Sequence, residues 1–471
     1  MRLLCFFLSI LIYLPVSRAA EKLRITCIGA SITAGARTAD PSSDAFPAQL
    51  QQKLGHQYII SNYGVSGTTM LKKGDKPYQL TTAFESALKS EPDIVLIDLG
   101  GNDSKAVNRP FLSELESDSR EMISRFAALP SHPRIILLLP VVSFRTDTSG
   151  IWDPVIVKAI IPRLQQAAWK ERTEVIDMHQ LLVNRPELFA DGIHPGTEGS
   201  HIMAERLYDV IVQKTAPGFD LFRKIDTGKK ISSFYGYDCA EFTIDGRNCK
   251  VVKPKQAAPG KPWIWRARFW GHEPQTDIAL LERGYHVVYC DVIELFGNSE
   301  AIGYWNRFYA LLQKAGLAKK AVMEGMSRGA VYALNWAAEN PGKVAAVYID
   351  NPVLDLKSWP AGKGKFKAWP KEYALFRTDY NLQTEEEVDH FHGSPIDKIR
   401  QLVKGKFPIL ILCADADEAV APEENTLPFA EKMKAAGADV TVLHKPGFKH
   451  HPHSLPNPEP IVNFILNHNR H

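Results

Sequence analysis

Short apolar runs alternate with longer amphipathic stretches along most of the chain. In the first half, the apolar runs are LRITCIG, YIISNYG, DIVLIDLG, RIILLLPVV and TEVIDMH, and segments with helical periodicity separate them. Strands that are apolar on both faces and alternate with helices are typical of a parallel sheet covered on both sides. The first half therefore predicts an α/β domain, which ends with the helix GTEGSHIMAERLYDVIV near residue 214.

The pattern changes after residue 214. The segment TAPGFDLFRKIDTGKK, residues 215–230, is predicted to link two domains. A β pattern then begins in FTIDGRNCKVVKP and PWIWRARFW, and strand–helix alternation resumes with YHVVYCDV, KKAVMEG, VAAVYID, FPILILCAD and VTVLHKP. A stretch from about 355 to 400, rich in Lys, Trp, Pro and Phe, breaks this rhythm and predicts an insertion or cap. We therefore expect one domain over 21–214 and a second over 231–471.

The N-terminus has the organisation of a secretory leader. Arg2 precedes an apolar run of about 14 residues, and Ser17-Arg18-Ala19 provides a cleavage pattern of small residues. The run is shorter than the ~20 residues that a membrane-spanning helix needs, although an anchor is the alternative. We expect a cleaved signal peptide over residues 1–20, no later membrane span, and export to the periplasm or the medium.

The composition and charge of the chain restrict the classes of binding partner that we expect. The chain has 471 residues, 45% hydrophobic and 23% charged, with a formal net charge of +3 and no polybasic block. This is ordinary globular composition, and it does not favour nucleic acid or an anionic membrane surface as a partner.

The cysteines do not form an obvious disulfide framework. Of six, Cys5 lies in the predicted leader, and the odd number left implies at least one free thiol. Asp245-Gly246 predicts a two-residue hairpin turn, whose register places Cys249 opposite Phe242 rather than Cys239. We expect no obligatory disulfide, and no C-x-x-C pair suggests a metal site.

Polar residues follow the apolar runs of the first half at four places. Ser31 follows LRITCIG, Gly64 ends YIISNYG, Asn102 follows DIVLIDLG, and Asp191 and His194 lie in DGIHP. Because ligands of an open parallel sheet bind beyond the carboxyl ends of its strands, these residues are expected to meet in one crevice.

The residue types suit ester hydrolysis. His194 can accept the Ser31 proton, and Asp191 can orient the imidazole. The N–H groups of Ser31 and Gly64 and the amide of Asn102 are candidate oxyanion donors, each typically worth about 3–4 kcal/mol. Taken singly, each has a structural explanation: Ser31 could cap a helix, and Asn102 could be a turn residue.

Together, IGASITAG, Tyr63-Gly64, GGND and DGIHP resemble the four blocks of the SGNH (GDSL-type) hydrolases, in order and spacing, over about residues 22–214. The resemblance implies a flavodoxin-like three-layer α/β/α fold, with Ser31 as nucleophile, His194 as base and Asp191 orienting it. It assigns Gly64 and Asn102 to the oxyanion hole. The first block usually reads Gly-Asp-Ser, and Ala30 replaces the Asp; that residue is not a triad member, so activity is expected to survive.

A second candidate nucleophile lies in Gly325-Met326-Ser327-Arg328-Gly329. The G-x-S-x-G pattern alone is weak, and a small-residue crossing would explain it equally well. Here it follows the predicted strand KKAVMEG and begins the predicted helix RGAVYALNWAAEN, as a serine on a strand–helix turn requires.

The later segments resemble the α/β-hydrolase pattern over about residues 231–471. The order Ser, then an acid, then His implies Asp417 and His450 as partners of Ser327. Asp415 and His451 are the alternatives. The resemblance implies oxyanion donors at the N–H of Arg328 and in the loop near Trp270. The cluster HHPH at 450–453 is also a possible metal-binding sequence, although we expect no metal and no cofactor.

The two resemblances imply an exported, two-domain serine esterase that removes acyl groups, acetyl first among them, from polysaccharides or oligosaccharides. The second site would take acetyl, feruloyl or methyl esters. The alternatives are a lipase or thioesterase, a peptidase in the second domain, or an active first domain joined to a glycan-binding one. Five tryptophans could stack on sugar or aryl rings, although most are expected in the core: Trp265, Trp270, Trp305, Trp359 and Trp369.

Overall fold

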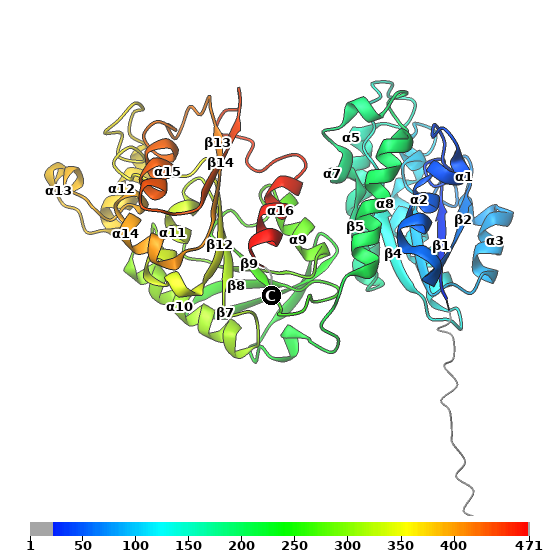
Figure 1. Cartoon of the computed structure of the whole chain (residues 1–471), viewed down its shortest axis with the longest axis horizontal. Helices are drawn as coiled ribbons and strands as arrows, with labels where there is room; N and C mark the ends of the chain where they lie inside the picture. The colour runs from blue at the N-terminus through cyan, green and yellow to red at the C-terminus, as the bar shows by residue number, and fades with distance from the viewer. Residues whose placement is uncertain (1–21, 470–471) are drawn as a thin grey trace, which may run out of the picture.

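The computed structural model describes residues 22–469, and the predicted leader lies outside this range. Figure 1 shows two α/β bodies side by side, the first blue to green and the second green to red. Each is built on its own sheet: five strands in the order β2-β1-β3-β4-β5, and nine in the order β14-β13-β12-β11-β9-β10-β8-β7-β6.

The first sheet is entirely parallel, and its five strands fall on the five predicted apolar runs. The strands are β1 (Leu23–Gly29), β2 (Tyr58–Gly64), β3 (Ile94–Asp98), β4 (Arg134–Leu139) and β5 (Glu174–Asp177). The helices are α1 (Pro41–Asp44), α2 (Phe46–Leu54), α3 (Thr82–Lys89), α4 (Leu115–Ala127), α5 (Asp153–Val155), α6 (Ile161–Lys170), α7 (Met178–Leu182) and α8 (Gly196–Val212). Apolar side chains pack on both faces of this sheet, as buried parallel strands require.

The register of the first sheet brings three strand ends to one level. Gly29 of β1 pairs with Gly64 of β2 on one side and with Asp98 of β3 on the other. The segments that follow these three residues therefore leave the sheet at the same edge, where an open parallel sheet binds its ligands.

The second sheet is parallel from β14 to β10 and antiparallel from β10 through β8 and β7 to β6. The strands are β6 (Lys230–Phe234), β7 (Tyr237–Ile244), β8 (Arg247–Val252), β9 (Trp263–Arg266), β10 (His286–Cys290), β11 (Ala321–Met326), β12 (Val344–Asp350), β13 (Ile409–Ala414) and β14 (Val440–Lys445). The helices are α9 (Gln275–Glu282), α10 (Ser299–Lys314), α11 (Gly329–Glu339), α12 (Pro370–Asp379), α13 (Glu385–Asp389), α14 (Ile399–Leu402), α15 (Thr426–Ala435) and α16 (Glu459–His468).

The hairpin between β7 and β8 has the predicted register. Asp245 and Gly246 both have positive φ, 49° and 80°, as a two-residue hairpin turn prefers, and Cys249 pairs with Phe242. In the described part of the chain all the cysteines are free and buried.

The segment predicted as a linker is not an exposed tether. Leu221 and Ile225 are almost fully buried in the core of the second body, with Phe222 beside them. The two bodies also share direct contacts: Tyr237 donates to the carbonyl of Val175 at 3.2 Å, for example. Three side chains of the predicted linker are therefore anchored in the core of the second body, while the rest of residues 215–230 is exposed or half-buried.

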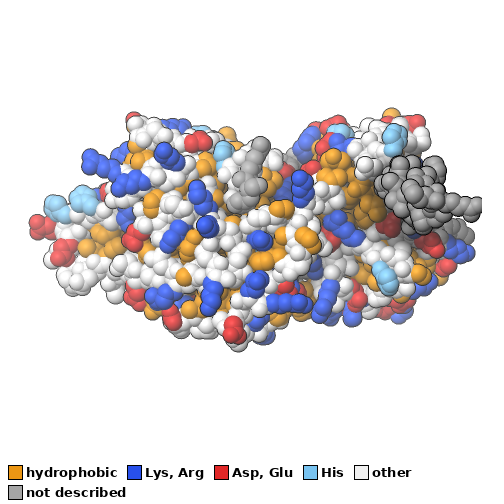
Figure 2. All heavy atoms as spheres, turned by 60° about the horizontal axis from the view of Figure 1, so that its bottom comes forward, with side chains coloured by type: hydrophobic (Ala, Val, Ile, Leu, Met, Phe, Trp, Pro, Cys, Tyr) orange, Lys and Arg blue, Asp and Glu red, His pale blue; other side chains and the backbone are white. Residues whose placement is uncertain are grey.

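Charged side chains are spread over the face of the molecule that Figure 2 presents. Figure 2 shows Lys and Arg side chains scattered over the presented face, among apolar and acidic ones. No single basic patch dominates this face, in keeping with the absence of a polybasic block in the sequence. No helix within residues 22–469 has the length and apolar character to cross a membrane.

Candidate active sites

The first candidate site lies at the carboxyl ends of β1 and β3 and in the loop before α8. The Ser31 hydroxyl lies 2.8 Å from Nε2 of His194, and Nδ1 of that ring lies 2.8 Å from Oδ2 of Asp191. A hydroxyl held by an imidazole that a carboxylate orients is the arrangement that activates serine for nucleophilic attack. The structure thus brings the three predicted residues into hydrogen-bonding contact.

Asp191 is held as a carboxylate. Its Oδ1 accepts the backbone N–H groups of Ile193 and His194, at 3.0 and 2.9 Å, and the exposed Arg37 side chain lies 3.2 Å from Oδ2. Partial burial raises the pKa of Asp191, but the hydrogen bonds from His194 and Ile193 outweigh it and leave that pKa well below its usual range. The ionised group can stabilise the imidazolium that forms when Ser31 loses its proton.

The two predicted oxyanion donors differ in availability. Asn102 is buried, and its side-chain amide donates one hydrogen bond to the carbonyl of Thr68 at 3.0 Å, which leaves its second N–H free to serve a substrate. The N–H of Gly64 instead donates to Oδ1 of Asn62 at 2.9 Å. An oxyanion would have to share or replace that hydrogen bond.

Gly64 has a packing role that the sequence did not reveal. A Cβ at this position would lie 2.4 Å from the backbone nitrogen of Ala34, in the turn that follows Ser31. Only glycine allows this approach, so the end of β2 packs directly against the turn that carries Ser31.

A small cavity of about 40 Å³ lies beside Ser31, and its lining includes Asn102, Asp98 and Ser143. Asp98 is buried there and accepts the Thr33 hydroxyl at 2.7 Å. Burial raises the pKa of Asp98 to about 6, and the hydrogen bond from Thr33 opposes this rise. No cation pairs with this carboxyl among the described residues.

Asp103, next to Asn102, fixes the loop that completes this site. Its buried carboxyl accepts the backbone N–H groups of Met70 and Leu71, at 3.0 and 2.8 Å. Burial raises the pKa of Asp103 to about 6, and the two backbone hydrogen bonds oppose the rise. The GGND segment therefore supplies both a side-chain amide and the anchor of the loop after β2.

The second candidate site joins the ends of β11, β13 and β14. The Ser327 hydroxyl lies 2.9 Å from Nε2 of His450, and Nδ1 of that ring lies 2.7 Å from Oδ2 of Asp417. Oδ1 of Asp417 accepts the N–H groups of Ala419 and Val420, both at 2.8 Å. Three residues predicted from separate segments again meet in the order hydroxyl, imidazole, carboxylate.

Ser327 has the strained backbone of a nucleophile turn. Its φ is +50°, a conformation that costs a non-glycine residue about 1–3 kcal/mol, and it lies between β11 and α11. A Cβ on Gly325 would lie 2.7 Å from the nitrogen of Ala330, so glycine there allows α11 to pack closely on β11. Gly325 of the motif thus has a physical reason.

The structure distinguishes the residues left open for this site. Asp415 contacts His444 at 2.6 Å, away from Ser327, and His451 makes no hydrogen bond to Ser327 within the described residues. Asp417 and His450 therefore form the triad contacts.

The loop after β9 approaches the motif at Gly329, two residues after Ser327, through Arg268 rather than through the predicted Trp270. A Cβ on Gly329 would lie 3.9 Å from the backbone nitrogen of Arg268. The ring of Trp270 packs instead on Phe234 and Tyr289, with centroids 4.8 and 5.5 Å away. The Arg328 guanidinium pairs with Glu372 of α12, so the segment between β12 and β13 reaches the residue after Ser327.

Buried charges support the second site, and the apolar periodicity did not identify them. The guanidinium of Arg266 lies 2.7 Å from Asp277 and 3.2 Å from Glu324. It also donates to the carbonyls of Phe269 and His272, at 3.1 and 2.8 Å, which holds the loop after β9. The sequence does contain one indication of these contacts, because Arg266 is a charged residue inside an otherwise apolar strand.

Asp350 and Lys445 form a second buried ion pair, at 2.9 Å, and the N–H of Ser454 donates to the same carboxylate. Burial raises the pKa of Asp350, but the nearby His453 and Lys445 outweigh burial and lower it. This ion pair anchors the loop that carries His450.

Among residues 22–469, two groups of side chains have ligand atoms close enough together to hold a metal ion. They are His450, His451 and His453, and Cys413, Asp415 and His444; within each group the ligand atoms lie within 4.8 Å of one another. In the first group, His450 already contacts Ser327 and Asp417. Most of the named tryptophans are core residues: Trp265 and Trp305 are fully buried, while Trp369 is 47% exposed.

Comparisons with known proteins match the first half. Residues 27–202 match the GDSL-like Lipase/Acylhydrolase family. An acetylxylan esterase from Xylanibacter ruminicola is 38% identical over 203 residues, 39% of this chain and 42% of that protein. The chain thus spans less than half the length of this curated relative.

Solved structures align with each half of the chain at low TM-scores. Est24, a carbohydrate acetylesterase from Sinorhizobium meliloti, is 19% identical and aligns with 40% of this chain and 98% of its own, at a TM-score of 0.35. A putative dipeptidyl aminopeptidase IV from Bacteroides ovatus is 16% identical and aligns with 51% of this chain and 36% of its own, at 0.38.

The N-terminal part is therefore a GDSL-type acylhydrolase domain, homologous to an acetylxylan esterase. This agrees with the first resemblance over the N-terminal part of the chain.

Proposed function

We propose that this protein is an exported serine esterase with two independent sites, acting on acylated carbohydrates. The observation that carries the proposal is the pair of hydroxyl–imidazole–carboxylate contacts at Ser31 and Ser327, each with both hydrogen bonds between 2.7 and 2.9 Å. The identity with an acetylxylan esterase over part of the chain supports the carbohydrate ester as substrate of the first site.

At the first site, His194 accepts the Ser31 proton while Oγ attacks the ester carbonyl. The second N–H of Asn102 and the backbone N–H of Ser31 stabilise the oxyanion, and Asp191 stabilises the imidazolium. His194 then gives the proton to the departing sugar oxygen, which leaves an acyl-serine. Water attacks this ester with His194 again as base, and the acid and the free hydroxyl of Ser31 result.

The cavity beside Ser31 favours a small acyl group. Its volume of about 40 Å³ has room for about three or four water-sized groups, since one water occupies roughly 10–15 Å³ on this measure. An acetyl group fits this space, whereas a feruloyl ring or a long acyl chain does not. The cavity thus argues against the lipase and thioesterase alternatives for this site.

At the second site we propose the same chemistry on an α/β-hydrolase scaffold, with Ser327, His450 and Asp417 in the corresponding roles. The backbone N–H groups of Arg328 and of Arg268, in the loop after β9, would form the oxyanion hole. The contact of Glu372 with Arg328 supports the segment between β12 and β13 as a cap. Acetyl, feruloyl and methyl esters are its candidate substrates.

The test compares Ser31→Ala with Ser327→Ala against para-nitrophenyl acetate, methyl ferulate and acetylated xylan. We expect Ser31→Ala to remove release of acetate from xylan, and Ser327→Ala to remove a different activity. If Ser31→Ala abolished every activity and Ser327→Ala none, the second half would not be an esterase for these substrates, and a glycan-binding role would replace it. Export is tested separately, by the N-terminal sequence of the mature protein, expected to begin near Ala20 or Glu21.

A further inference from the structure

Two buried cysteines face each other across neighbouring antiparallel strands of the second body. Cys249 of β8 lies directly opposite Cys290 of β10, and the two residues are 1% and 2% exposed. Both are free thiols and belong to the same apolar core cluster. Because directly opposite residues project their side chains from the same face of a sheet, the two thiols are neighbours inside this core.

The cysteine pair occupies the narrower kind of cross-strand position. The N–H of Asp291 donates to the carbonyl of Asn248 at 2.9 Å, so the adjacent pair of opposite residues is hydrogen-bonded. Hydrogen-bonded and non-hydrogen-bonded pairs alternate along an antiparallel ladder, which makes Cys249 and Cys290 a non-hydrogen-bonded pair, with Cα atoms typically about 4.5 Å apart. Disulfides span Cα separations of roughly 4.4–6.8 Å. The backbone therefore accommodates a bond between the two sulfur atoms without separation of the strands.

The two side chains also point toward each other. A hydrogen bond with the Cys249 thiol, together with burial, raises the pKa of the Cys290 thiol. The Cys249 thiol itself donates to the carbonyl of Arg247 at 3.6 Å. Thiols are weak hydrogen-bond donors, so these contacts offer little resistance to replacement by a covalent bond.

The other described cysteines have no thiol opposite them. In the register of the two sheets, the residues that pair with Cys27, Cys239 and Cys413 are Asn62, Leu96, Ser232, Val252 and His444. Among residues 22–469, Cys249 and Cys290 are therefore the one pair of cysteines directly opposed in a sheet.

We propose that Cys249 and Cys290 are oxidised to a cross-strand disulfide, with a small-molecule or protein disulfide as the oxidant. The thiolate of one cysteine attacks the oxidant and releases one of its sulfur atoms as a thiolate; the thiolate of the other cysteine then attacks the mixed disulfide and releases the second. One S–S bond forms in this chain, one S–S bond breaks in the oxidant, and the two cysteine protons end on the two released thiols. The geometry is independent of both esterase sites, and only the occurrence of the bond in the cell rests on the proposed export, because extracytoplasmic compartments are oxidising.

The bond is expected to form while the second body folds. In the folded chain both thiols are buried, and the raised pKa of Cys290 keeps that thiol protonated, whereas exchange requires an accessible thiolate. The same burial shields the finished disulfide from reductants.

The disulfide would join two differently built parts of the second sheet. β8 begins the antiparallel extension β8-β7-β6, and β10 belongs to the parallel part that includes β11, the strand before Ser327. The bond closes a loop of about 40 residues, which restricts the unfolded chain. We therefore expect oxidation to raise the melting temperature of the second body by roughly 5–15 °C.

The test produces the chain from residue 21 onward in two ways. One preparation is secreted behind a host export signal and folds in an oxidising periplasm, and the other is made without a signal in a reducing cytoplasm. Free thiols are blocked with N-ethylmaleimide in denaturant, and the peptides are mapped by mass spectrometry. We expect a peptide pair joined through Cys249 and Cys290 in the first preparation, and alkylation of both cysteines in the second. Alkylation of both cysteines in the periplasmic preparation, or a bond from either one to another cysteine, would overturn the proposal.

Thermal melting of the two preparations measures the consequence of the bond. The difference in melting temperature should vanish in Cys290→Ala, which cannot form the bond, and persist in Cys239→Ala, the matched control on the adjacent strand β7. A difference that Cys290→Ala retained would contradict the assignment of the stabilisation to this bond. If Cys290→Ala did not fold, the peptide map of the parent chain would still decide the proposal. Loss of both esterase activities with the bond intact would overturn only the proposed function.

Discussion

The two candidate triads have nearly the same contacts but differ in how they are built and how deeply they lie. In the first, the side chains of Asp191 and His194 are 22% and 16% exposed, and the two residues lie three positions apart in one turn. In the second, Asp417 and His450 are 2% and 10% exposed and come from the ends of two neighbouring strands. The first site is compact and open, whereas the second is assembled from distant segments and buried.

The buried carboxyl groups near the two sites also differ in their partners. Asp98, at the end of β3 in the first body, is a buried carboxyl that accepts the Thr33 hydroxyl and forms no ion pair with another described residue. Asp350, at the end of β12 in the second, pairs with a buried lysine. The loops of the more deeply buried site are anchored by buried ion pairs. Removing one partner of such a pair is strongly destabilising, because the other charge is left buried without compensation.

The largest expected effect is loss of the orienting carboxylate. Asp191→Asn and Asp417→Asn should each lower kcat at their own site by about 10³–10⁴-fold, because the amide favours the wrong imidazole tautomer. Steady-state kinetics on the substrate of each site measures this. If Asp191→Asn lowered both activities equally, the two sites would not be independent.

Asn102→Ala should affect the first site alone. Loss of one oxyanion donor is expected to lower kcat about 10²–10³-fold with a small change in KM, because the hydrogen bond forms mainly in the transition state. The second activity, measured on the same preparation, is the control. A large rise in KM with kcat unchanged would mean that Asn102 only binds substrate.

The two buried carboxyls should respond to pH in opposite directions. The raised pKa of Asp98 makes folding less favourable as pH rises from about 4 to about 6, so Asp98→Asn should gain stability relative to the parent above pH 6, by up to about 3 kcal/mol. The lowered pKa of Asp350 gives stability that is present above about pH 4 and lost as pH falls. Asp350→Asn should therefore lose about 3–5 kcal/mol at neutral pH, since Lys445 is left buried without its partner.

Thermal melting of the three chains at about pH 4.5 and about pH 8 measures both effects. If Asp98→Asn instead lowered the melting temperature at the higher pH, the ionised Asp98 carboxylate would be stabilised by an interaction partner.

Arg37→Ala should produce the smallest effect. Arg37 lies 3.2 Å from Asp191, but its side chain is 69% exposed, and such ion pairs typically contribute about 0–1 kcal/mol. We expect less than a fivefold change in kcat/KM at the first site, diminishing further at high salt. A loss beyond tenfold would show that Arg37 also binds substrate.

The sequence was sufficient to predict features that depend on the residues of a single segment. The strand runs of the first body, the DGIHP turn and the Ser327 turn follow from local periodicity and short motifs, and the structure has them at the predicted positions. Asp417 could be separated from Asp415 only by the fold, because both follow the same strand and differ in which histidine they meet.

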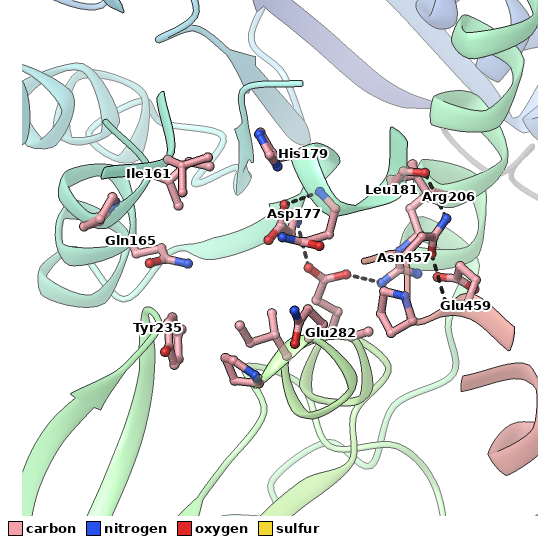
Figure 3. Close-up of a pocket in the computed structure, with 18 residues that line it drawn as sticks. Ile161, Gln165, Asp177, His179, Leu181, Arg206, Tyr235, Glu282, Asn457 and Glu459 are labelled. Atoms are coloured by element: carbon pink, nitrogen blue, oxygen red, sulfur yellow. Dashed lines mark hydrogen bonds and ion pairs between the residues drawn. The ribbon is translucent and has the colours of Figure 1, made fainter. Parts of the chain in front are cut away.

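Contacts between distant segments could not be predicted. The burial of Leu221 and Ile225 and the pairing of Arg266 with Asp277 both depend on how separate elements pack. A pocket between the bodies is a further example, since residues from Val157 to Glu459 line it (Figure 3).

The most direct test of two independent sites is covalent labelling with a fluorophosphonate, followed by intact-mass measurement. This reagent forms a stable ester only with a serine whose hydroxyl is activated. We predict two labels on the parent chain, one each on Ser31→Ala and Ser327→Ala, and none on the double variant. A single label on the parent chain, lost in Ser31→Ala and retained in Ser327→Ala, would contradict the account of the second site.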